Sequence, residues 1–148
     1  MEKNIPIKLL TMLANMHSVY DDLLKPICQK YGLQKNALNI LLFLANNPDY
    51  NTAKDITNFR CIKPSLISFH VEKLVECGYI ERQEAKGDRR KQQLFCTKKA
   101  SAIIEQGRQV QKHYAQTMLQ NISKDDLSVF KQCLEQIGVN ATNYMQKK

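Results

Sequence analysis

The sequence lacks the features that mark several large classes of protein. No stretch approaches the roughly 18 apolar residues of a membrane span, and residues 1–10 lack the apolar core and small-residue cleavage site of a secretory signal. The cysteines form no CxxC pair, and their odd number argues against a disulfide framework: Cys28, Cys61, Cys77, Cys96 and Cys133. These absences predict a cytoplasmic protein with reduced thiols.

Motifs of catalysis are missing as well. The chain has no P-loop, no glycine-rich dinucleotide motif and no GxSxG sequence. Its three histidines, His17, His70 and His113, are far apart and form no HxxH or HxxxH pair, so no metal site is expected. We therefore predict a protein that is not an enzyme and that needs no cofactor.

Positive charge is the main compositional signal. The 148 residues include 22 Lys and Arg against 14 Asp and Glu, which gives a formal net charge of +8. Residues 52–99 hold eleven of these cations and six of the acids, so the excess lies in the middle third. Such an excess favours a polyanionic partner. The length fits one compact domain over residues 1–148.

Periodic apolar residues predict long helices at both ends of the chain. Residues 5–31 form an amphipathic helix that Gly32 ends, and a second helix follows over 35–46. Thr97 is a plausible N-cap for a helix to about Gln120, although Gly107 inside it costs about 1 kcal/mol relative to Ala. Ser123–Asp126 has capping-box spacing and opens the last helix.

The middle third has a different pattern. Thr52 and Asp55 form a capping box that starts a short helix ending near Arg60, and Pro64 starts another helix over 64–77. Two strand-length runs, 79–84 and 92–96, then surround a turn at Gly87-Asp88. Helix, turn, helix and hairpin make a winged helix, whose wing carries three consecutive cations, Arg89, Arg90 and Lys91. The predicted fold class is therefore mainly α (α+β).

The order of these elements resembles the MarR (multiple antibiotic resistance regulator) family of bacterial transcription factors. The wing pattern of that family, Asp, any residue, Arg and a later Thr, is matched by Asp88, Arg90 and Thr97. Its recognition-helix pattern is matched by Ser65, Ser68, Leu74 and Gly78. The resemblance implies one winged helix-turn-helix lobe over 33–97, with dimerisation helices in 1–32 and 98–148.

The resemblance also implies which residues contact double-stranded DNA. Leu66 and Phe69 stand where many members carry polar or cationic side chains, so the base preferences of relatives do not transfer. Phe69 could contact a thymine methyl group or pack against a neighbouring helix. The expected DNA-binding residues are Lys63, Ser65, Ser68, Phe69, Lys73, Asp88, Arg89, Arg90 and Lys91.

Two further expectations concern the terminal helices. Their apolar stripes are too long for one winged helix to cover, which predicts a homodimer through Leu9, Met12, Leu127, Phe130, Leu134 and Ile137. Met16, His17 and Tyr20 could line a pocket for a small-molecule effector or could belong to the core.

The predicted function is sequence-specific regulation of transcription. We expect a ligand-responsive repressor that binds a pseudo-palindromic operator as a homodimer. The alternatives are a winged helix that docks RNA or a protein partner, and a redox- or metal-sensing member of the same family.

Overall fold

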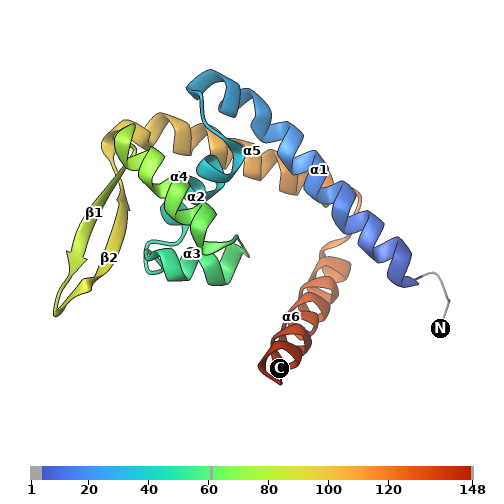
Figure 1. Cartoon of the computed structure of the whole chain (residues 1–148). Helices are drawn as coiled ribbons and strands as arrows, with labels where there is room; N and C mark the ends of the chain where they lie inside the picture. The colour runs from blue at the N-terminus through green and yellow to red at the C-terminus, as the bar shows by residue number, and fades with distance from the viewer. Residues whose placement is uncertain (1–4, 61, 148) are drawn as a thin grey trace. The chain divides into compact units, whose positions relative to one another are not determined.

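The structure is a computed structural model that describes residues 5–60 and 62–147, with the side chains of residues 6–60, 62–87 and 91–147. Helices dominate, and one β-hairpin follows the fourth helix (Figure 1). The chain divides into two compact units, one up to Tyr114 and the other from Ala115 onward. None of the described helices combines the length and hydropathy needed to cross a membrane.

The first four helices lie where the sequence predicts them. Gly32 and Gly78 follow the first and fourth of these helices with φ of +64° and +74°, a conformation in which glycine avoids the steric cost of a side chain. The short third helix begins after the predicted capping box, in which the Asp55 amide donates to Thr52 Oγ1 at 3.2 Å. The bounds are α1 Ile5–Tyr31, α2 Lys35–Asn46, α3 Ala53–Arg60 and α4 Pro64–Glu76.

The hydrophobic core forms around α2. Nearly every apolar residue of α2 is buried, which requires neighbours on several sides of this helix. Those neighbours include Leu24 and Ile27 from the C-terminal half of α1, and Ile56 from α3. From α4 come Ile67, Val71 and Leu74.

The hairpin differs from its predicted form. Strand β1 covers Ile80–Ala85 and strand β2 covers Asp88–Cys96, so β2 begins four residues before the predicted 92–96 run. Residues 86 and 87 form a two-residue turn in which Gly87 has φ +87°. The pairing then shifts from Ala85–Asp88 to Glu84–Gln92, and this irregularity accommodates residues 89–91 within the strand.

Thr97 closes the base of the hairpin. Its hydroxyl donates to the Gly78 carbonyl oxygen at 2.6 Å, and its amide donates to the Tyr79 carbonyl oxygen at 3.0 Å. Thr97 holds the N-cap position as predicted, but it makes no side-chain cap bond because its hydroxyl is used across the hairpin. A short 3-10 helix, Lys98–Ala100, comes next, and α5 spans Ser101–Met118.

Polar side chains join α5 to α1 and α2. Gln111 Nε2 donates to the Tyr20 hydroxyl at 3.1 Å, and Asn46 Nδ2 donates to Gln111 Oε1 at 2.9 Å. Arg108 Nη2 donates to the Ala45 carbonyl oxygen at 2.8 Å, at the C-terminal end of α2. These bonds fasten the outer helices to the helix at the centre of the core.

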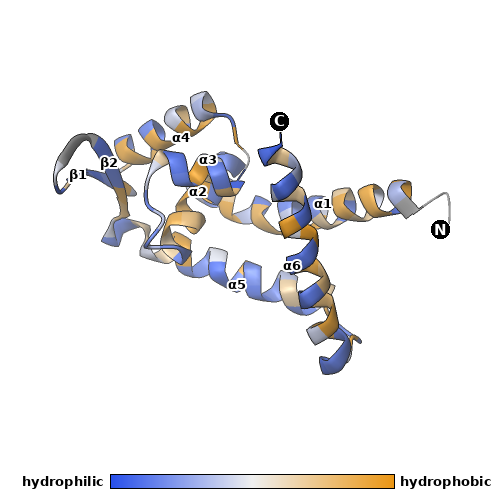
Figure 2. Cartoon of the chain, turned by 90° about the horizontal axis from the view of Figure 1, so that it is seen from below, coloured by the Kyte–Doolittle hydropathy of each residue, from blue (hydrophilic) through white to orange (hydrophobic). Residues whose placement is uncertain are grey.

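The unit from Ala115 onward contains α6, Lys124–Gln146. Ser123 caps it as predicted, accepting from the Asp126 amide at 3.1 Å. No residue of α6 is buried within the chain, although Phe130, Leu134 and Ile137 project from it. Figure 2 shows hydrophobic residues recurring along α6 and along α1.

A Gly107→Ala substitution tests the packing of α5 on α2. A Cβ atom at Gly107 would lie 2.4 Å from Leu42 Cδ2, and Leu42 is buried. Overpacking costs about 1–3 kcal/mol, and this exceeds the gain of about 1 kcal/mol in helix propensity. We expect a net loss of about 1 kcal/mol in the free energy of unfolding, measured by urea denaturation at one protein concentration.

Gly138→Ala in α6 is the matched control, because a Cβ there has nothing within 4 Å. It should raise the free energy of unfolding by up to about 1 kcal/mol. Equal stabilisation by both substitutions would show that α5 and α2 are not in this close contact.

Candidate nucleic-acid interface

One face of α4 is buried and the opposite face is exposed. Burial of Ile67, Val71 and Leu74 leaves Leu66, Ser68 and Phe69 facing outward. Ser65 and Ser68 are exposed there. Leu66 and Phe69 are 42% and 48% exposed on the same face. α4 therefore presents hydroxyl groups and apolar surface together.

The two lysines predicted around α4 are in different situations. Lys63 is exposed at the residue before the helix. Lys73 Nζ donates to Glu76 Oε2 at 2.7 Å, and this bond raises the pKa of Lys73. Lys73 is thus already paired with Glu76, and the sequence did not predict this ion pair.

His70 lies on the inner side of α4. It is 3% exposed, and its ring meets the ring of Phe69 edge to face at 5.2 Å between centroids. Burial lowers the pKa of His70 below its ordinary value of 6.5, because the charged imidazolium loses hydration. The ring is therefore neutral near pH 7, and His70 acts as part of the support of the exposed face.

The wing supplies Lys91, whose side chain is exposed on β2. The side chains of Asp88, Arg89 and Arg90 lie outside the described residues. Their roles in DNA contact, including an Asp88 carboxylate that orients Arg90, stay predictions. Their backbone belongs to the part of β2 next to the hairpin turn.

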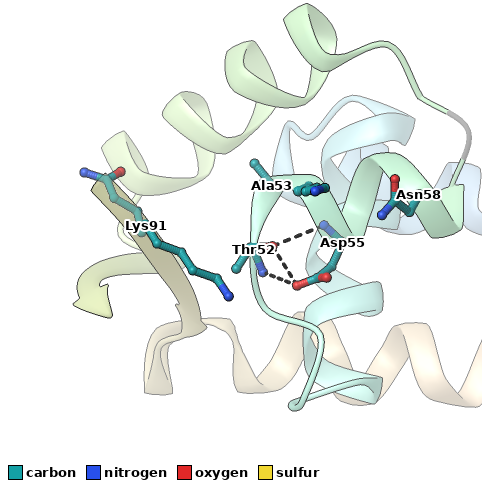
Figure 3. Close-up of a pocket in the computed structure, with 7 residues that line it drawn as sticks. Thr52, Ala53, Asp55, Asn58 and Lys91 are labelled. Atoms are coloured by element: carbon teal, nitrogen blue, oxygen red, sulfur yellow. Dashed lines mark hydrogen bonds between the residues drawn. The ribbon is translucent and has the colours of Figure 1, made fainter. Parts of the chain in front are cut away.

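A cleft of about 720 Å³ lies between the first turns of α3 and the wing strand β2 (Figure 3). Lys91 lines it from β2, and Lys54 and Asn58 line it from α3. Sequence reasoning missed Lys54, although the inward position of Ile56 already indicated that residues 54 and 58 share the outer side of α3. The cleft extends the cationic surface from the wing to the helix before α4.

The three residues considered for an effector pocket do not form one cluster. Met16 is 37% exposed and His17 is exposed, whereas Tyr20 is half-buried. The Tyr20 ring meets Tyr114 of α5 at 5.2 Å between centroids, and the Tyr114 hydroxyl donates to the Met16 carbonyl oxygen at 3.1 Å. Tyr20 therefore packs between α1 and α5.

The described residues contain no group of three or more His, Cys, Asp or Glu that could hold a metal ion. Cys77 and Cys133 are exposed, and Cys61 lies outside the described residues. Cys28 and Cys96 are half-buried, and burial raises the pKa of both thiols, which disfavours the reactive thiolate.

Comparisons with known proteins show what this arrangement is similar to. A family model described as the MarR family matches residues 31–91, which include α2, α3, α4 and the start of the hairpin. The chain is therefore similar to the MarR family over those residues. Comparison with proteins of curated function gives no significant sequence match.

Solved structures extend the likeness of fold to the rest of the chain. A crystal structure of MarR is 17% identical and has a TM-score of 0.74, with coverage of 100% of this chain and 99% of its own. A MarR protein from Peptoclostridium difficile is 21% identical, covers 97% and 91%, and has a TM-score of 0.76. The transcriptional regulator SlyA is 17% identical, covers 91% and 94%, and has a TM-score of 0.78.

MarR family proteins are transcription regulators that bind DNA. The similarity to this family over residues 31–91 supports the prediction of a DNA-binding regulator that is not an enzyme, and the predicted winged helix is confirmed as a fold. Helix α4, the wing residues up to Lys91 and the first turns of α3 all lie within the matched residues 31–91.

Acid should destabilise the protein in part through His70. The folded-state pKa lies below the unfolded value of 6.5. The neutral buried ring therefore contributes its full stability above about pH 6.5, and this contribution is lost as the pH falls through the folded-state pKa. We expect His70→Gln to reduce the loss of unfolding free energy between about pH 7.5 and about pH 5.5.

His113→Gln is the matched control, because His113 is exposed on α5. It should leave the pH dependence of urea unfolding as in the wild type. If His70→Gln also left the pH dependence of unfolding unchanged, burial of the neutral His70 ring would not contribute to that dependence.

Proposed function

We propose that this protein regulates transcription by binding a pseudo-palindromic DNA site as a homodimer, with α4 in the major groove and the wing in the adjacent minor groove. The observation that carries the proposal is the exposed face of α4. It presents the hydroxyl groups of Ser65 and Ser68 beside the large apolar side chains of Leu66 and Phe69.

The chemistry of that face fits the edges of bases. Serine hydroxyls donate to or accept from either base of a pair, and apolar side chains contact the thymine methyl group. A surface meant only for phosphate would need cations, and the cations lie around α4 instead, at Lys63, Lys54 and Lys91. This arrangement suits a helix that contacts bases while the lysines around it bind the phosphates of the DNA backbone.

A homodimer is supported by the apolar surface of the terminal helices. On α1, Leu9 and Met12 are 49% and 58% exposed, and on α6 Ile137 is 60% exposed. The other predicted interface residues are Phe130 and Leu134, both exposed, and Leu127, which is half-buried. Apolar surface of this extent marks an interface in a soluble protein, and two-fold symmetry would present two copies of α4 to the DNA.

The finer proposal of a ligand-responsive repressor rests on the same helices. An effector bound beside Tyr20 would contact both α1 and α5, since the Tyr20 ring packs on Tyr114. If the effector bound one arrangement of the dimer's two DNA-binding lobes more tightly than another, it would change the affinity of the dimer for its operator. A thermal-shift screen with phenolic compounds, metal ions and peroxide tests whether such an effector exists.

Phe130→Asp should convert the dimer to a monomer. The substitution places a carboxylate in the proposed apolar interface, where burial of an unpaired charge is strongly unfavourable. Analytical ultracentrifugation at micromolar concentration should then show the 17.1 kDa species.

Val139→Asp is the control for this measurement. Nine residues separate the two positions, which places Val139 on the opposite side of α6 at 100° per residue, and Val139 is 52% exposed. It should remain dimeric. A wild-type protein that is itself a folded monomer at this concentration would contradict the proposal.

Substitutions on α4 should separate base reading from phosphate binding. Ser68→Ala and Phe69→Ala should change which bases are preferred, at a cost of about 1–3 kcal/mol on the best wild-type site. Lys63→Ala should weaken binding to all sequences and lower the salt slope by about one unit. Selection of duplexes from a random pool, followed by binding titrations, measures both effects.

Lys112→Ala removes the same charge from an exposed position on α5 and should leave the affinity unchanged. If the α4 variants lost affinity with no change in base preference, α4 would bind only phosphate. Failure of the wild type to enrich any duplex, together with stable binding of RNA or a protein, would favour the alternative docking function.

A further inference from the structure

The wing leaves the core within a few residues of its base. Ile80, the first residue of β1, is 2% exposed, and the next four residues of the strand are exposed. On β2, Leu94 is 4% exposed, and its amide donates to the Asn51 carbonyl oxygen at 2.8 Å. Ile80 and Leu94 thus anchor the base, and Figure 1 shows the hairpin extending away beyond it.

One ion pair links the hairpin to α4 at this point. Arg82 Nη2 donates to Glu72 Oε2 at 2.7 Å. Arg82 is the register partner of Leu94, so the pair acts at the last level where the hairpin is buried. Arg82 also lines a small cleft together with Ser68 of α4 and Gln92 of β2.

The position of this pair at the base of the hairpin lets it affect where the wing tip lies. A strand rises about 3.3 Å per residue, so the turn lies roughly 10–15 Å beyond Arg82. A small change in the direction of the hairpin at Arg82 therefore produces a larger displacement of residues 89–91. Since α4 is held by the core, a contact between Glu72 and Arg82 sets the direction of the wing relative to the recognition helix.

We propose that Glu72 and Arg82 are positioning residues that hold the wing at the angle required for α4 and the wing cations to contact DNA together. The inference rests on the proposed DNA-binding function. A wing that is already oriented loses less conformational entropy on binding, so the pair increases affinity without touching a base.

Simple electrostatics makes the opposite prediction for Glu72. A carboxylate near the DNA repels phosphate, and its pairing with Arg82 would withhold a cation from the backbone. On that view Glu72→Gln should tighten DNA binding. On our proposal it should weaken binding, because the wing loses its restraint although the protein becomes more basic. The sign of the effect therefore decides between the two.

The test uses the full-length protein and a fluorescent duplex selected from a random pool by the wild type. Glu72→Gln and Arg82→Gln should each weaken binding about two- to fivefold, as expected for a partly exposed ion pair. The double variant should bind about as weakly as Arg82→Gln alone. Reversal of the pair, Glu72→Arg with Arg82→Glu, should restore most of the affinity.

Glu76→Gln is the matched control, since Glu76 is an acid on the same helix that pairs with Lys73 instead of the hairpin. Removal of the Glu76 charge should tighten DNA binding. Backbone amide exchange gives a second readout without DNA: it should accelerate in β1 and β2 of both pair variants and stay unchanged in Glu76→Gln.

Tighter binding by Glu72→Gln, as in Glu76→Gln, would overturn the positioning role while leaving DNA binding intact. A wild-type protein that selects no duplex would instead overturn the proposed function itself. Unchanged amide exchange in both pair variants would also overturn the inference.

Discussion

Burial of one side of α4 is the constraint on which the rest of this structure depends. Ile67, Val71 and Leu74 enter the core around α2, and the helical period then leaves Ser65, Ser68 and Phe69 no position except the exposed face. Because the packed side is rigid, the exposed side is presented in one orientation. A surface that distinguishes bases needs this rigidity, since a hydrogen bond to a base edge tolerates little displacement.

The support of α4 continues outward from the core. α2 contributes the packing surface, and Gly107 lets α5 approach it closely enough for Leu42 to fill the space. Arg108 and Gln111 then bind the C-terminal end of α2, and Gln111 reaches Tyr20 on α1. Helix α1, which carries part of the proposed dimer contacts, is thereby joined to α2 through directional bonds as well as apolar contacts.

Local signals in the sequence predicted much of this fold. The capping boxes at Thr52 and Ser123 and the stop at Gly32 placed helix ends correctly, because each acts within one turn of the chain. The candidate DNA-binding residues of α4 were named from the resemblance to the MarR family. The helical period accounts for their exposure, because Ile67, Val71 and Leu74 occupy the buried side.

Features that depend on distant residues were not predicted. The strand pairing absorbs residues 89–91 in a register shift, and Thr97 bonds across the hairpin to Gly78. Gly107 was counted as a weakness of its helix, since only the position of Leu42 shows why a larger residue does not fit. The pairs Glu72–Arg82 and Lys73–Glu76 were missed because sequence alone does not say which charges meet.

Hydroxyl-radical footprinting on a duplex selected by the wild type tests the central claim, that a symmetric pair of α4 helices reads DNA. Two protected half-sites related by two-fold symmetry are expected, with centres about 10 to 10.5 base pairs apart. The minor grooves on the outer sides of the half-sites should also be protected. Protection of a single unsymmetrical segment, or of all positions equally, would contradict the claim.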